Sequence, residues 1–497
     1  MNASGGRVGS DAVVRSFPPV PLAEAVATVG GQIRGDDATL VADVVVDHRE
    51  VIAGSVFCCV PGATADGHDF AAAAVDAGAA ALMVERWLDV DVAQVRVASV
   101  RAAMGSVSAA VYGRPADALT TAGVTGTNGK TTSTYLLESV FETAGMTSGL
   151  IGTTGARIAG RPSPLAHTTP EAPDLQRLFA SMRDAGVSAV AMEVSSHALA
   201  QHRVDGIVFD VATFTNLSQD HLDYHPSMEA YFEAKARLFT PALARAGVVN
   251  VDDRWGRRLA ELAEVPVTTY ALDTEADVRA TEVRSDVRGV SFRCEGILVR
   301  STLRGRFNVT NCLGVLAAAR SLGIDPARAA EGIERAPMVP GRMEPIDEGQ
   351  DFLVVVDYAH TPDSILGVLR ASRPLAAGRV IVVFGCGGDR DRAKRPEMGR
   401  AATSLADHTI ITSDNPRSED PLAIIREIER GAADGGGAYV IEPDRRAAIG
   451  LAIDQARPGD VVVIAGKGHE TVQELAGGSL PFDDRDVARA ALRSEAR

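Results

Sequence analysis

Apolar residues in this chain gather in short runs that are separated by longer stretches of helical periodicity. The clearest runs are dense in valine, isoleucine and alanine, at residues 187–194, 208–215, 353–356, 380–384, 409–412 and 461–465. Such short apolar runs are typical of strands that are covered on both faces of a parallel sheet. Because helical stretches lie between them, the pattern predicts an α/β fold with mainly parallel sheets.

The length of the chain and the breaks in its hydrophobic pattern indicate three domains. A chain of 497 residues is long enough for about three domains. We expect a smaller N-terminal α/β domain over residues 1–117, a central domain over 118–340, and a C-terminal domain of repeated strand–helix units over 341–497. Residues 1–16 are small and polar, and we expect them to be disordered. The expected N-terminal elements are strands at 41–46, 55–60 and 79–84 and a helix at 70–78.

Composition excludes some classes of partner. Hydrophobic residues make up 46% of the chain and charged residues 23%, which is ordinary for a globular protein. The formal net charge of −15 argues against nucleic acid or an anionic membrane as the main partner. An anionic ligand must therefore be held by local positive groups against the overall field.

The cysteines and the apolar content indicate a compartment. Five cysteines, an odd number without metal-ligand spacing, form a poor disulfide framework: Cys58, Cys59, Cys294, Cys312 and Cys386. Reduced thiols in the cytoplasm are the simplest interpretation. Residues 1–17 lack the apolar core of a signal peptide, and the most apolar run, 71–84, is too short to cross a bilayer. We therefore expect a cytoplasmic protein without a membrane span. We also expect a monomer.

The most informative stretch is a glycine loop between a strand and a helix. An apolar segment ends at Val124, Gly-Thr-Asn-Gly-Lys-Thr-Thr follows at residues 126–132, and a helical pattern runs on to Phe141. Glycine lets backbone N–H groups turn toward phosphate oxygens, and the helix N-terminus adds partial positive charge. Lys130 is placed to reach terminal phosphates, and a threonine hydroxyl to bind Mg²⁺. Since Val124 stands where the full motif has its first glycine, a helix-capping turn is the alternative.

Polar residues directly follow many of the predicted strands. Glu193 lies at the end of the 187–194 run, and His221 lies shortly after the 208–215 run. Four further loops follow strands in the last third of the chain, at residues 357–360, 385–390, 413–417 and 466–470. Ligands of open α/β sheets bind outside the carboxyl ends of strands, so we expect these loops to form binding faces. The glycine loop that begins at residue 385 would alone suggest a dinucleotide fold, but the acidic residue that this motif requires does not follow it.

Lys235 lies on the apolar face of a predicted helix. Met228, Tyr231, Phe232 and Phe239 form a stripe at helical spacing, and Lys235 is four residues from both Tyr231 and Phe239. A lysine on a buried face requires a partner or a chemical modification. The alternative is a side chain that snorkels outward and keeps its ammonium group in water.

Several of these motifs together resemble the Mur ligase family. They are the loop at 126–132 with asparagine before its second glycine, the Tyr-Phe-Glu-Ala-Lys segment that ends at Lys235, and Val-Asp-His-Arg at 46–49, where family members usually carry serine in place of His48. The resemblance extends over almost the whole chain. It implies a uridine-nucleotide sugar domain, a central phosphate-loop ATPase domain with a mainly parallel sheet, and a Rossmann-like amino-acid domain, in that order.

The resemblance also implies a reaction in peptidoglycan precursor synthesis. Family members are ATP-dependent amide-forming ligases. ATP would phosphorylate the free D-glutamate carboxylate of UDP-MurNAc-L-Ala-D-Glu, and the amine of meso-diaminopimelate would attack the acyl phosphate. Activation is required because a carboxylate and an amine are not a reactive pair, and phosphoryl transfer requires charge to be neutralised along its path. ATP is then the co-substrate, and Mg²⁺ at two sites is the cofactor.

The family match assigns a role to each candidate residue. The catalytic group is Lys130, His221 and Lys235, with Lys235 carbamylated by CO₂, and Mg²⁺ is expected on Thr131, Glu193, His221 and the Lys235 carbamate. ATP is expected on Gly126, Thr127, Asn128, Gly129, Lys130, Thr131, Thr132, Asn308, Arg342, Asp357 and His360. The muramoyl dipeptide nucleotide is expected on Val46, His48, Thr168, Thr169, Ser195, Gln201 and Arg203. Diaminopimelate is expected on Arg390, Asp414, Asn415, Pro416, Arg417, Gly466 and Glu470.

Arg417 determines which amino acid we expect. A turn explains residues 414–416 but not a cation at 417 in so acidic a protein. Meso-diaminopimelate differs from lysine by one carboxylate, which a guanidinium holds with two parallel hydrogen bonds. A lysine-adding ligase is therefore the nearest alternative, and a ligase similar to folylpolyglutamate synthetase fits less well. A nucleotide-binding regulator would need the phosphate loop but neither Lys235 nor Arg417.

Overall fold

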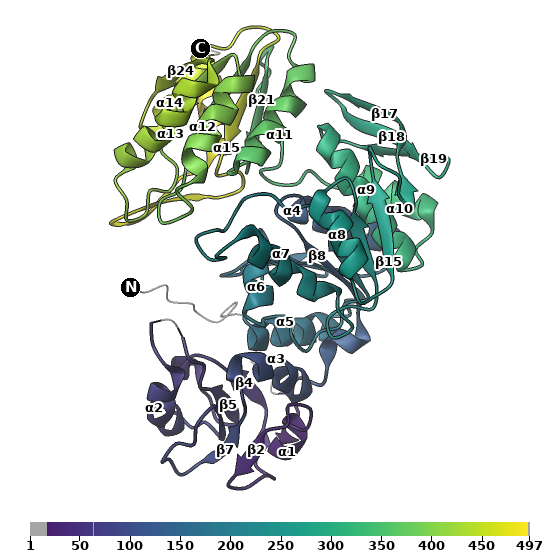
Figure 1. Ribbon diagram of the computed structural model, residues 1–497, viewed down its shortest axis with the longest axis vertical. Helices are drawn as coiled ribbons and strands as arrows, with labels where there is room; N and C mark the ends of the chain where they lie inside the picture. Colours follow the sequence, from purple (N-terminus) through teal and green to yellow (C-terminus); the bar gives the residue numbers. More distant parts are fainter. Residues whose placement is uncertain (1–16, 63, 496–497) are drawn as a thin grey trace.

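The computed structural model describes residues 17–62 and 64–495, so the disorder predicted for residues 1–16 lies outside the described part. Three α/β domains follow one another along the long axis of the molecule, with the N-terminal domain at one end and the C-terminal domain at the other (Figure 1). Each domain has its own sheet and its own hydrophobic core, which confirms the predicted fold class.

The N-terminal domain is built on a five-stranded sheet in the order β2-β7-β6-β5-β4. Strands β4 to β7 are parallel, and β2 is antiparallel at the edge. The elements are β2 Gln32–Arg34, β4 Asp43–Val45, β5 Ser55–Cys58, β6 Ala81–Val84, β7 Ala93–Arg96, α1 Leu22–Ala25, α2 Ala71–Asp76 and α3 Val100–Val111. The helix predicted at 70–78 and the strands predicted at 55–60 and 79–84 are therefore present with shorter bounds.

The strand predicted at 41–46 is present only in part, as β4 at residues 43–45, because Val41 belongs to a different strand. Leu40–Val41 (β3) pairs with Val20–Pro21 (β1) in a separate ribbon, whereas β4 joins the main sheet. Asp43 at the start of β4 is buried, and its carboxylate accepts hydrogen bonds from the Tyr112 hydroxyl at 2.6 Å and the Arg177 guanidinium at 3.0 Å. These long-range polar contacts fix β4 in place, and a hydrophobic pattern does not reveal them.

The central domain contains a nine-stranded sheet in the order β11-β10-β9-β12-β8-β13-β14-β15-β16. The strands from β9 to β16 in this order are parallel, and β10 and β11 add an antiparallel edge. The strands are β8 Thr120–Thr125, β9 Ser148–Gly152, β10 Gly155–Ile158, β11 Arg161–Ser163, β12 Ala189–Glu193, β13 Val211–Phe214, β14 Gly247–Asn250, β15 Val267–Ala271 and β16 Val278–Arg279.

Helices cover both faces of the central sheet. The helices are α4 Lys130–Thr143, α5 Ala172–Asp184, α6 Ser196–Ala200, α7 Met228–Ala236, α8 Arg254–Leu262, α9 Arg306–Ser321 and α10 Pro326–Arg335. One core gathers around Leu136 and Leu313, and the other around Phe179 and Phe232. A small antiparallel sheet of β17 Thr281–Asp286, β18 Gly289–Cys294 and β19 Ile297–Ser301 packs against α9 and α10. Burial on two faces explains why the central strands are nearly continuous apolar runs.

The C-terminal domain has a six-stranded sheet in the order β20-β21-β25-β22-β23-β24, parallel except for β20. The strands are β20 Glu344–Ile346, β21 Leu353–Asp357, β22 Val380–Phe384, β23 His408–Ile411, β24 Ala438–Ile441 and β25 Val461–Ala465. The helices are α11 Pro362–Ser372, α12 Lys394–Leu405, α13 Pro421–Gly435, α14 Arg445–Asp454 and α15 Asp484–Glu495. A hairpin of β26 Val472–Leu475 and β27 Gly478–Pro481 extends from the end of the sheet.

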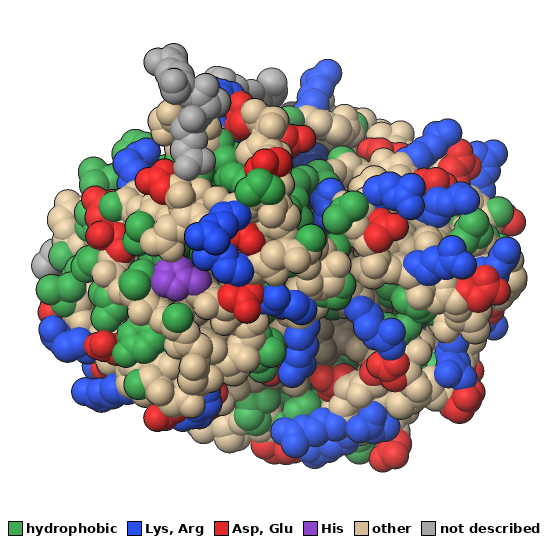
Figure 2. Space-filling model, turned by 90° about the horizontal axis from the view of Figure 1, so that it is seen from above, with side chains coloured by type: hydrophobic (Ala, Val, Ile, Leu, Met, Phe, Trp, Pro, Cys, Tyr) green, Lys and Arg blue, Asp and Glu red, His purple; other side chains and the backbone are tan. Residues whose placement is uncertain are grey.

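The exterior of the molecule is mixed in charge and has no exposed cysteine. On the face shown in Figure 2, basic and acidic side chains are interspersed, and neither sign forms a large continuous patch. All five cysteines are buried, and burial raises the pKa of their thiols, to about 12 for Cys59 and about 11 for Cys294. No helix among the described residues combines the length and the apolar character needed to span a membrane.

Candidate active site

The parallel register of the central sheet determines where the candidate site lies. Glu193 at the end of β12 lies opposite Val124 of β8, and Phe214 at the end of β13 lies opposite Thr125. The three strands therefore end at one edge. The phosphate loop, residues 126–129, meets the loops that follow β12 and β13 there, as the sequence predicts for ligand-binding loops.

The glycines of the phosphate loop are required by close contacts. Gly126 has φ +148°, and a Cβ atom on it would lie 1.9 Å from Thr215 Oγ1. Gly129 has φ +89°, and a Cβ atom there would lie 2.5 Å from Asn311 Oδ1. Backbone in this region of φ and contacts this short both exclude a side chain. The glycines thus let the loop lie directly against the end of β13 and against α9.

The two residues that follow β13 hold the phosphate loop in place through hydrogen bonds. Thr215 Oγ1 donates a hydrogen bond to the Asn128 carbonyl at 2.6 Å, and Asn128 N–H donates to Asn216 Oδ1 at 2.9 Å. Thr127 N–H donates to the Asn216 carbonyl at 2.8 Å. Sequence reasoning did not assign Thr215, Asn216 or Asn311 to the site. Their position just past a buried strand, or at the start of a helix, was the available signal.

Two lysines converge on one carbonyl of this loop. Lys130 Nζ donates to the Gly126 and Thr127 carbonyls at 2.9 Å each, and Lys235 Nζ donates to the same Gly126 carbonyl at 2.9 Å. Lys235 is 1% exposed, so the alternative of an outward, snorkelling side chain is wrong. Its ammonium also lies 4.6 Å from the centre of the Tyr231 ring. Within the described residues, neither lysine has a carboxylate within ion-pair distance.

The electrostatics of the lysines follow from this arrangement. Burial lowers the pKa of Lys130, and the nearby Glu193 and Asp220 carboxylates partly offset the effect. Burial and then the positive charge of Lys130 lower the pKa of Lys235 well below its ordinary value. A lysine amine that is partly deprotonated is a nucleophile, which is the form that reacts with CO₂. The surroundings of Lys235 therefore suit the predicted carbamate.

Glu193 and the predicted dipeptide residues form one hydrogen-bonded group. The Glu193 carboxylate accepts from the Thr153 N–H at 2.9 Å and from Thr153 Oγ1 at 3.0 Å, and Thr153 Oγ1 lies 3.3 Å from Thr168 Oγ1. Thr169 Oγ1 donates to the Glu193 carbonyl at 2.9 Å and accepts from the Ser195 N–H at 3.2 Å. The structure thus brings Thr168, Thr169 and Ser195 together beside Glu193.

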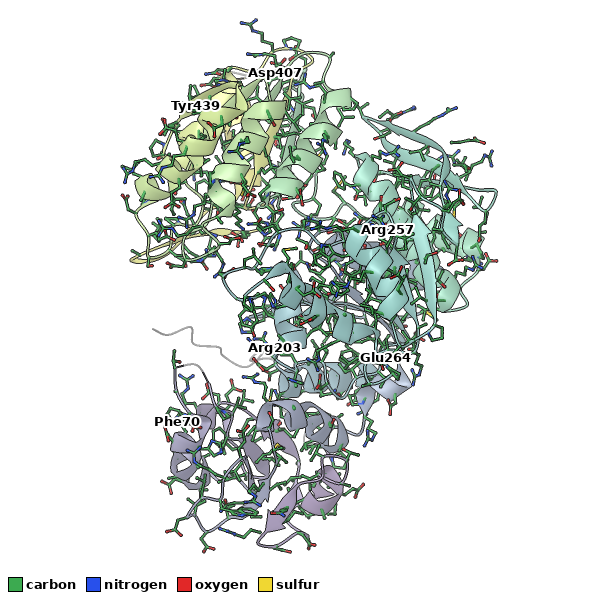
Figure 3. All side chains as sticks on the ribbon, viewed as in Figure 1. Phe70, Arg203, Arg257, Glu264, Asp407 and Tyr439 are labelled. Atoms are coloured by element: carbon green, nitrogen blue, oxygen red, sulfur yellow. The ribbon has the colours of Figure 1, made fainter. Side chains whose placement is uncertain are left out.

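Arg203 and Gln201 extend this group toward the N-terminal domain. The Arg203 guanidinium donates to Gln201 Oε1 at 2.7 Å and to the Thr169 carbonyl at 3.0 Å, and it lies 3.1 Å from Glu171. Glu171 also pairs with Arg101 of α3 at 2.6 Å. Figure 3 shows Arg203 on the side of the central domain that faces the N-terminal domain.

In the N-terminal domain, the predicted nucleotide residue His48 has an aromatic partner. Its ring stacks on Phe70 with the centroids 4.7 Å apart and an interplanar angle of 5°. Phe70 is 37% exposed. Neighbouring Asp47 accepts from Arg49 Nε at 2.9 Å, and this bond chiefly lowers the pKa of the Asp47 carboxyl. Val46 lies just after β4, so the segment sits at the carboxyl end of a parallel strand.

His221 and Asp220 lie where the central domain meets the C-terminal domain. Asp220 is buried, and its carboxylate lies 3.4 Å from His221 Nε2, 3.6 Å from His360 Nε2 and 3.4 Å from Lys394 Nζ. Burial raises the pKa of Asp220, but these partners outweigh it and leave the value well below its usual range. Burial, assisted by the positive charges of Lys130 and Lys235, lowers the pKa of His221 to about 3. The imidazole is therefore neutral and keeps a lone pair for a ligand.

The residues expected to hold Mg²⁺ fit that ion in chemistry. They supply one carboxylate, Glu193, one hydroxyl, Thr131 Oγ1, and one neutral imidazole, His221. No group of three or more His, Cys, Asp or Glu side chains in the described part of the chain is close enough to bind a metal by itself. Mg²⁺ commonly uses one or two carboxylates and completes its shell with water and substrate phosphates. A sparse protein set next to a phosphate loop is the arrangement expected for such a site.

The nucleotide-side residues gather around the same loop. Arg342 donates to Thr131 Oγ1 at 3.0 Å, and its guanidinium lies 4.5 Å from the centre of the Tyr358 ring. Asp357 accepts from the Met343 N–H at 2.7 Å, and burial raises the pKa of its carboxyl. Asn308 on the first turn of α9 accepts from Asn311 Nδ2 on the second turn at 2.9 Å, and Asn311 lies beside Gly129. The structure therefore brings together the nucleotide-side residues that the sequence places on separate elements.

Four loops of the C-terminal domain follow the carboxyl ends of its parallel strands β21, β22, β23 and β25. We call residues 385–391, after β22, the first amino-acid loop and residues 413–419, after β23, the second amino-acid loop. In the second loop, Asn415 Nδ2 donates to Glu470 Oε2 at 2.8 Å. A Cβ atom on Gly466 would lie 2.5 Å from Asp414 Oδ2, so that position requires glycine. Pro416 follows in the same loop, and its carbonyl lies against the first loop.

The two arginines of these loops differ in their surroundings. Arg390 is exposed, and its charge makes a small contribution to the lowered pKa of His197 in the central domain, which is caused chiefly by burial. Arg417 has φ +51°, and its Nε lies 2.6 Å from Glu474 Oε2 in the β26–β27 hairpin. Its Nη1 donates to the Gly388 carbonyl at 2.9 Å. A carboxylate is thus already present at the guanidinium that we expected to bind one.

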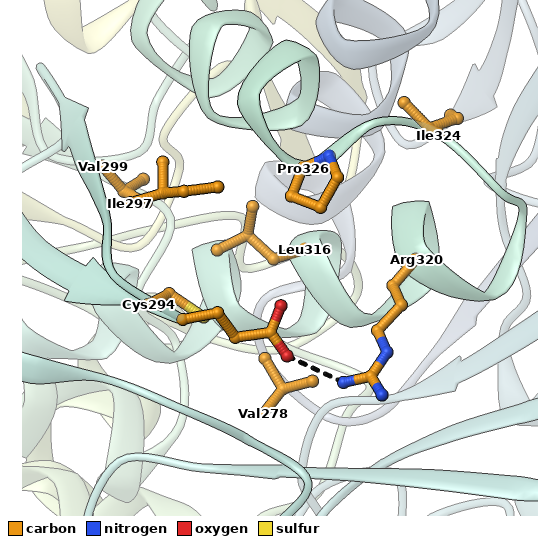
Figure 4. Close-up of a pocket in the computed structure, with 9 residues that line it drawn as sticks. Val278, Cys294, Ile297, Val299, Leu316, Arg320, Ile324 and Pro326 are labelled. Carbon is orange, nitrogen blue, oxygen red and sulfur yellow. Dashed lines mark hydrogen bonds and ion pairs between the residues drawn. The ribbon is translucent and has the colours of Figure 1, made fainter.

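A separate hollow lies away from this site. It encloses about 360 Å³, part of which is open solvent, and is lined mainly by apolar side chains of β18, β19, α9 and the start of α10, such as Val299, Leu316 and Ile324 (Figure 4). Arg320 and Glu295 form an ion pair of 2.8 Å at its edge. Because α9 carries Asn308 near its other end, the hollow is about 12 to 18 Å along the helix from that residue. We assign no role to it.

Comparison with known proteins identifies the class. Three family models match successive parts of the chain: the Mur ligase family catalytic domain at residues 41–115, the Mur ligase middle domain at 124–319, and the Mur ligase glutamate ligase domain at 341–468. The chain belongs to the Mur ligase family.

Individual relatives are similar over nearly their whole length. UDP-N-acetylmuramoyl-L-alanyl-D-glutamate--2,6-diaminopimelate ligase of Streptomyces coelicolor is 48% identical over 490 residues, covering 95% of this chain and 96% of that protein. The ligase of the same name from Geobacillus thermodenitrificans is 48% identical over 471 residues, covering 93% and 96%. A solved structure with this name is 34% identical, with a TM-score of 0.70, and covers 97% of this chain and 100% of its own. MurF from Acinetobacter baumannii, 20% identical with a TM-score of 0.67, shares the fold and covers 91% of this chain and 96% of its own.

Proposed function

We propose that this protein is an ATP-dependent ligase that adds meso-2,6-diaminopimelate to the D-glutamate side chain of UDP-MurNAc-L-Ala-D-Glu in peptidoglycan precursor synthesis. The relatives that are 48% identical over nearly the whole chain carry this activity in their names. The observation that carries the proposal is the convergence of Lys130 and Lys235 on the Gly126 carbonyl, beside the Glu193 group and opposite the amino-acid loops. Two cations and a carboxylate suited to a metal thus lie on neighbouring loops of the central domain, which supports the proposal.

The phosphate loop and its lysines would bind ATP and stabilise phosphoryl transfer. When phosphates enter, the loop amides and Lys130 Nζ exchange internal partners for phosphate oxygens, which places positive charge where negative charge develops. Glu193, Thr131, neutral His221 and a Lys235 carbamate would hold Mg²⁺, which supplies Lewis-acid neutralisation of the phosphate charge when bound. Asn308, Arg342, Asp357 and His360 would contact the nucleotide.

The other residues would orient the two substrates that become joined. The group around Thr168, Thr169, Ser195, Gln201 and Arg203 would hold the dipeptide so that its D-glutamate carboxylate faces the γ-phosphate. His48, stacked on Phe70, and Val46 would lie on the nucleotide side of that substrate. Attack by the amine on the acyl phosphate forms the amide bond and releases phosphate, and a proton leaves the amine.

The amino-acid loops would select the incoming amine. Arg417, with Asp414, Asn415 and Pro416, would bind the distal centre of diaminopimelate, and Arg390 would bind the carboxylate at the reacting end. Gly466 and Glu470 would complete this binding site. Because lysine lacks the distal carboxylate, it would leave the Arg417 guanidinium without its partner, and sites of this kind reject such analogues strongly.

The proposal includes the organisation of the chain. We place the domain boundaries at 117/118 and 340/341. The buried, reduced cysteines support a cytoplasmic setting, and we propose a monomer.

One experiment tests the reaction and its nearest alternative. Purified protein is offered ATP, Mg²⁺ and UDP-MurNAc-L-Ala-D-Glu with a panel of amino acids, and products are read by mass. We expect one product, containing diaminopimelate, with phosphate released only when that amino acid is present. A lysine-containing product formed equally well would favour the lysine-adding alternative. Phosphate release without any amino acid would contradict a ligase.

A further inference from the structure

The two amino-acid loops are bonded to each other along their length. Gly388 N–H donates to the Asn415 carbonyl at 2.9 Å, and Arg417 Nη1 donates back to the Gly388 carbonyl at 2.9 Å. Further on, Ser418 donates from its N–H and its hydroxyl to the Asp389 carboxylate, at 3.1 and 2.7 Å. The hydrogen bonds therefore fix the position of one loop relative to the other. The distance between Arg390 on the first loop and Arg417 on the second depends on that relative position.

The relative position of the two loops requires unfavourable backbone conformations in both. Asp389 in the first loop has φ +53°, and Arg417 in the second has φ +51°, both in the left-handed region that side chains other than glycine rarely adopt. A Cβ atom on Gly388 would lie 1.9 Å from the Pro416 carbonyl oxygen. Such conformations persist only where the surrounding contacts over-determine them.

An ion pair between a buried arginine and a half-buried glutamate lies beneath the place where the loops join. Arg395 on the first turn of α12 is 0% exposed, and its guanidinium donates to both oxygens of Glu419, at 2.9 and 2.7 Å. The same guanidinium donates to the Gly387 carbonyl of the first loop at 3.1 Å. Glu419, the last residue of the second loop, accepts in turn from the Asp389 N–H at 2.7 Å. Each member of the pair thus contacts the first loop as well as its own element.

We propose that the Arg395–Glu419 ion pair positions Arg390 and Arg417 for the amino-acid substrate, and so helps to determine which amino acid is used. The inference rests on the proposed function of this site. Asp389 is adjacent to Arg390, and Glu419 is two residues from Arg417, so a change in the pair alters both arginines together. The bidentate geometry fixes orientation as well as distance. Charge agrees with the geometry, since the bond to Arg395 lowers the pKa of Glu419 to about 2 and keeps it ionised.

The chain offers a matched control for this pair. Glu427 of α13 accepts from the same guanidinium at 2.8 Å and also pairs with Arg392 on the surface. Among the described residues, it makes no hydrogen bond to either amino-acid loop. Glu427→Gln therefore removes one negative charge from Arg395 and leaves the hydrogen bonds between the two loops in place. Glu419→Gln removes one negative charge as well, and it also weakens the link between Arg395 and the two loops.

The test compares the two variants as full-length enzymes in steady-state ligation assays. For Glu419→Gln we expect the KM for meso-diaminopimelate to rise about tenfold, as the loss of a charge-assisted hydrogen bond predicts, and discrimination against lysine to fall with it. The KM for ATP should stay within about twofold in both variants, because the phosphate loop lies in another domain. For Glu427→Gln the KM for meso-diaminopimelate should also change by less than about twofold.

The possible outcomes distinguish failure of the positioning role from failure of the proposed function. Equal effects of Glu419→Gln and Glu427→Gln on the KM for meso-diaminopimelate, or a Glu419→Gln change confined to kcat, would overturn the positioning role. A wild-type enzyme that does not ligate meso-diaminopimelate would overturn the proposed function instead. If Glu419→Gln fails to fold, Ser418→Ala decides the question, because it removes only an exposed hydroxyl from the same junction. It should raise the KM for meso-diaminopimelate about threefold, and no change would count against the inference.

Discussion

Buried and half-buried cations occur in two regions of this molecule, and the partners of these cations differ between the two regions. At the phosphate loop, Lys130 and Lys235 bond to backbone carbonyls, and no carboxylate of the described chain lies within ion-pair distance. At the amino-acid loops, Arg395 pairs with Glu419, Arg445 with Asp484 at 2.6 Å, and Lys467 with Glu470 at 3.0 Å. Each of the latter cations has an internal acid partner.

The difference separates a binding role from a supporting role. A buried charge without a counterion destabilises the protein, and an external anion that supplies the counterion is bound correspondingly well. A buried charge with a counterion fixes its surroundings and leaves less net field for a ligand. The phosphate loop therefore has unbalanced positive charge that favours an anion. At the amino-acid loops the charges are balanced by internal ion pairs, which fix the shape of the loops.

Removal of Lys130 should have the largest effect on activity. Because the lysine has no acid partner in the described part of the chain, Lys130→Ala should leave stability unchanged or slightly higher while it removes charge stabilisation from phosphoryl transfer. We expect kcat to fall by a hundredfold or more, about 3 kcal/mol. Ligation assays and thermal unfolding on the same preparation check both parts. Near-normal ligation by folded Lys130→Ala would contradict the role given to the loop.

Lys235 should show a comparable loss that can be reversed chemically. If its amine carries a carbamate, Lys235→Ala removes two oxygen donors, and we expect activity to fall about a hundredfold. A small carboxylic acid added to the assay should restore part of this activity, because it can supply oxygens in the space left behind. The same acid added to Lys130→Ala is the control and should restore nothing. An active wild-type enzyme with an unmodified amine in high-resolution density would argue against the carbamate.

Lys467 tests the other side of the comparison. It is 0% exposed and donates to Asn415 Oδ1 at 2.8 Å and to the Val472 carbonyl at 2.6 Å, in addition to its pair with Glu470. Lys467→Met should destabilise the C-terminal domain by about 2 kcal/mol, below the range for a fully buried pair because Glu470 is partly exposed. Denaturant unfolding measures the change. A Lys467→Met protein as stable as the wild type would break the distinction between the two regions.

The smallest effect is expected at Glu474. Its carboxylate pairs with the Arg417 guanidinium, and under the proposed function the substrate carboxylate would have to displace it. Since both side chains are partly exposed, we expect Glu474→Gln to lower the KM for meso-diaminopimelate by only about threefold. Steady-state kinetics decide the matter, with the KM for ATP as the control. A higher KM for meso-diaminopimelate would instead show that Glu474 recognises the distal ammonium group.

Much of the fold followed from the hydrophobic pattern because its strands are buried on both faces. The runs at 380–384 and 461–465 match β22 and β25 residue for residue. The pattern did not predict β24 or the β26–β27 hairpin, since their side chains are largely exposed and carry no periodic signal. Glu474, which lies in that hairpin, was therefore absent from the predicted site.

The site was predictable where a motif or a strand end marked it, and not where long-range pairing defines it. Lys130, Glu193 and Lys235 each stand out locally, and the structure brings them to one edge. Asp220 acquires its importance from Lys394, 174 residues further along the chain. Arg395 similarly depends on partners 24 and 32 residues away, and before the fold is known it resembles any arginine on a polar helix.

The burial of all five cysteines has a practical consequence for the study of motion in this ligase. Their thiols are buried and have raised pKa values, so maleimide dyes, which require an accessible thiolate, should leave the native protein unlabelled. One new cysteine on α2 and another on α13 would then carry a fluorescent donor and acceptor without any native cysteine being replaced. Energy transfer between the dyes would report the separation of the outer domains during turnover, in a chain that otherwise keeps its natural sequence.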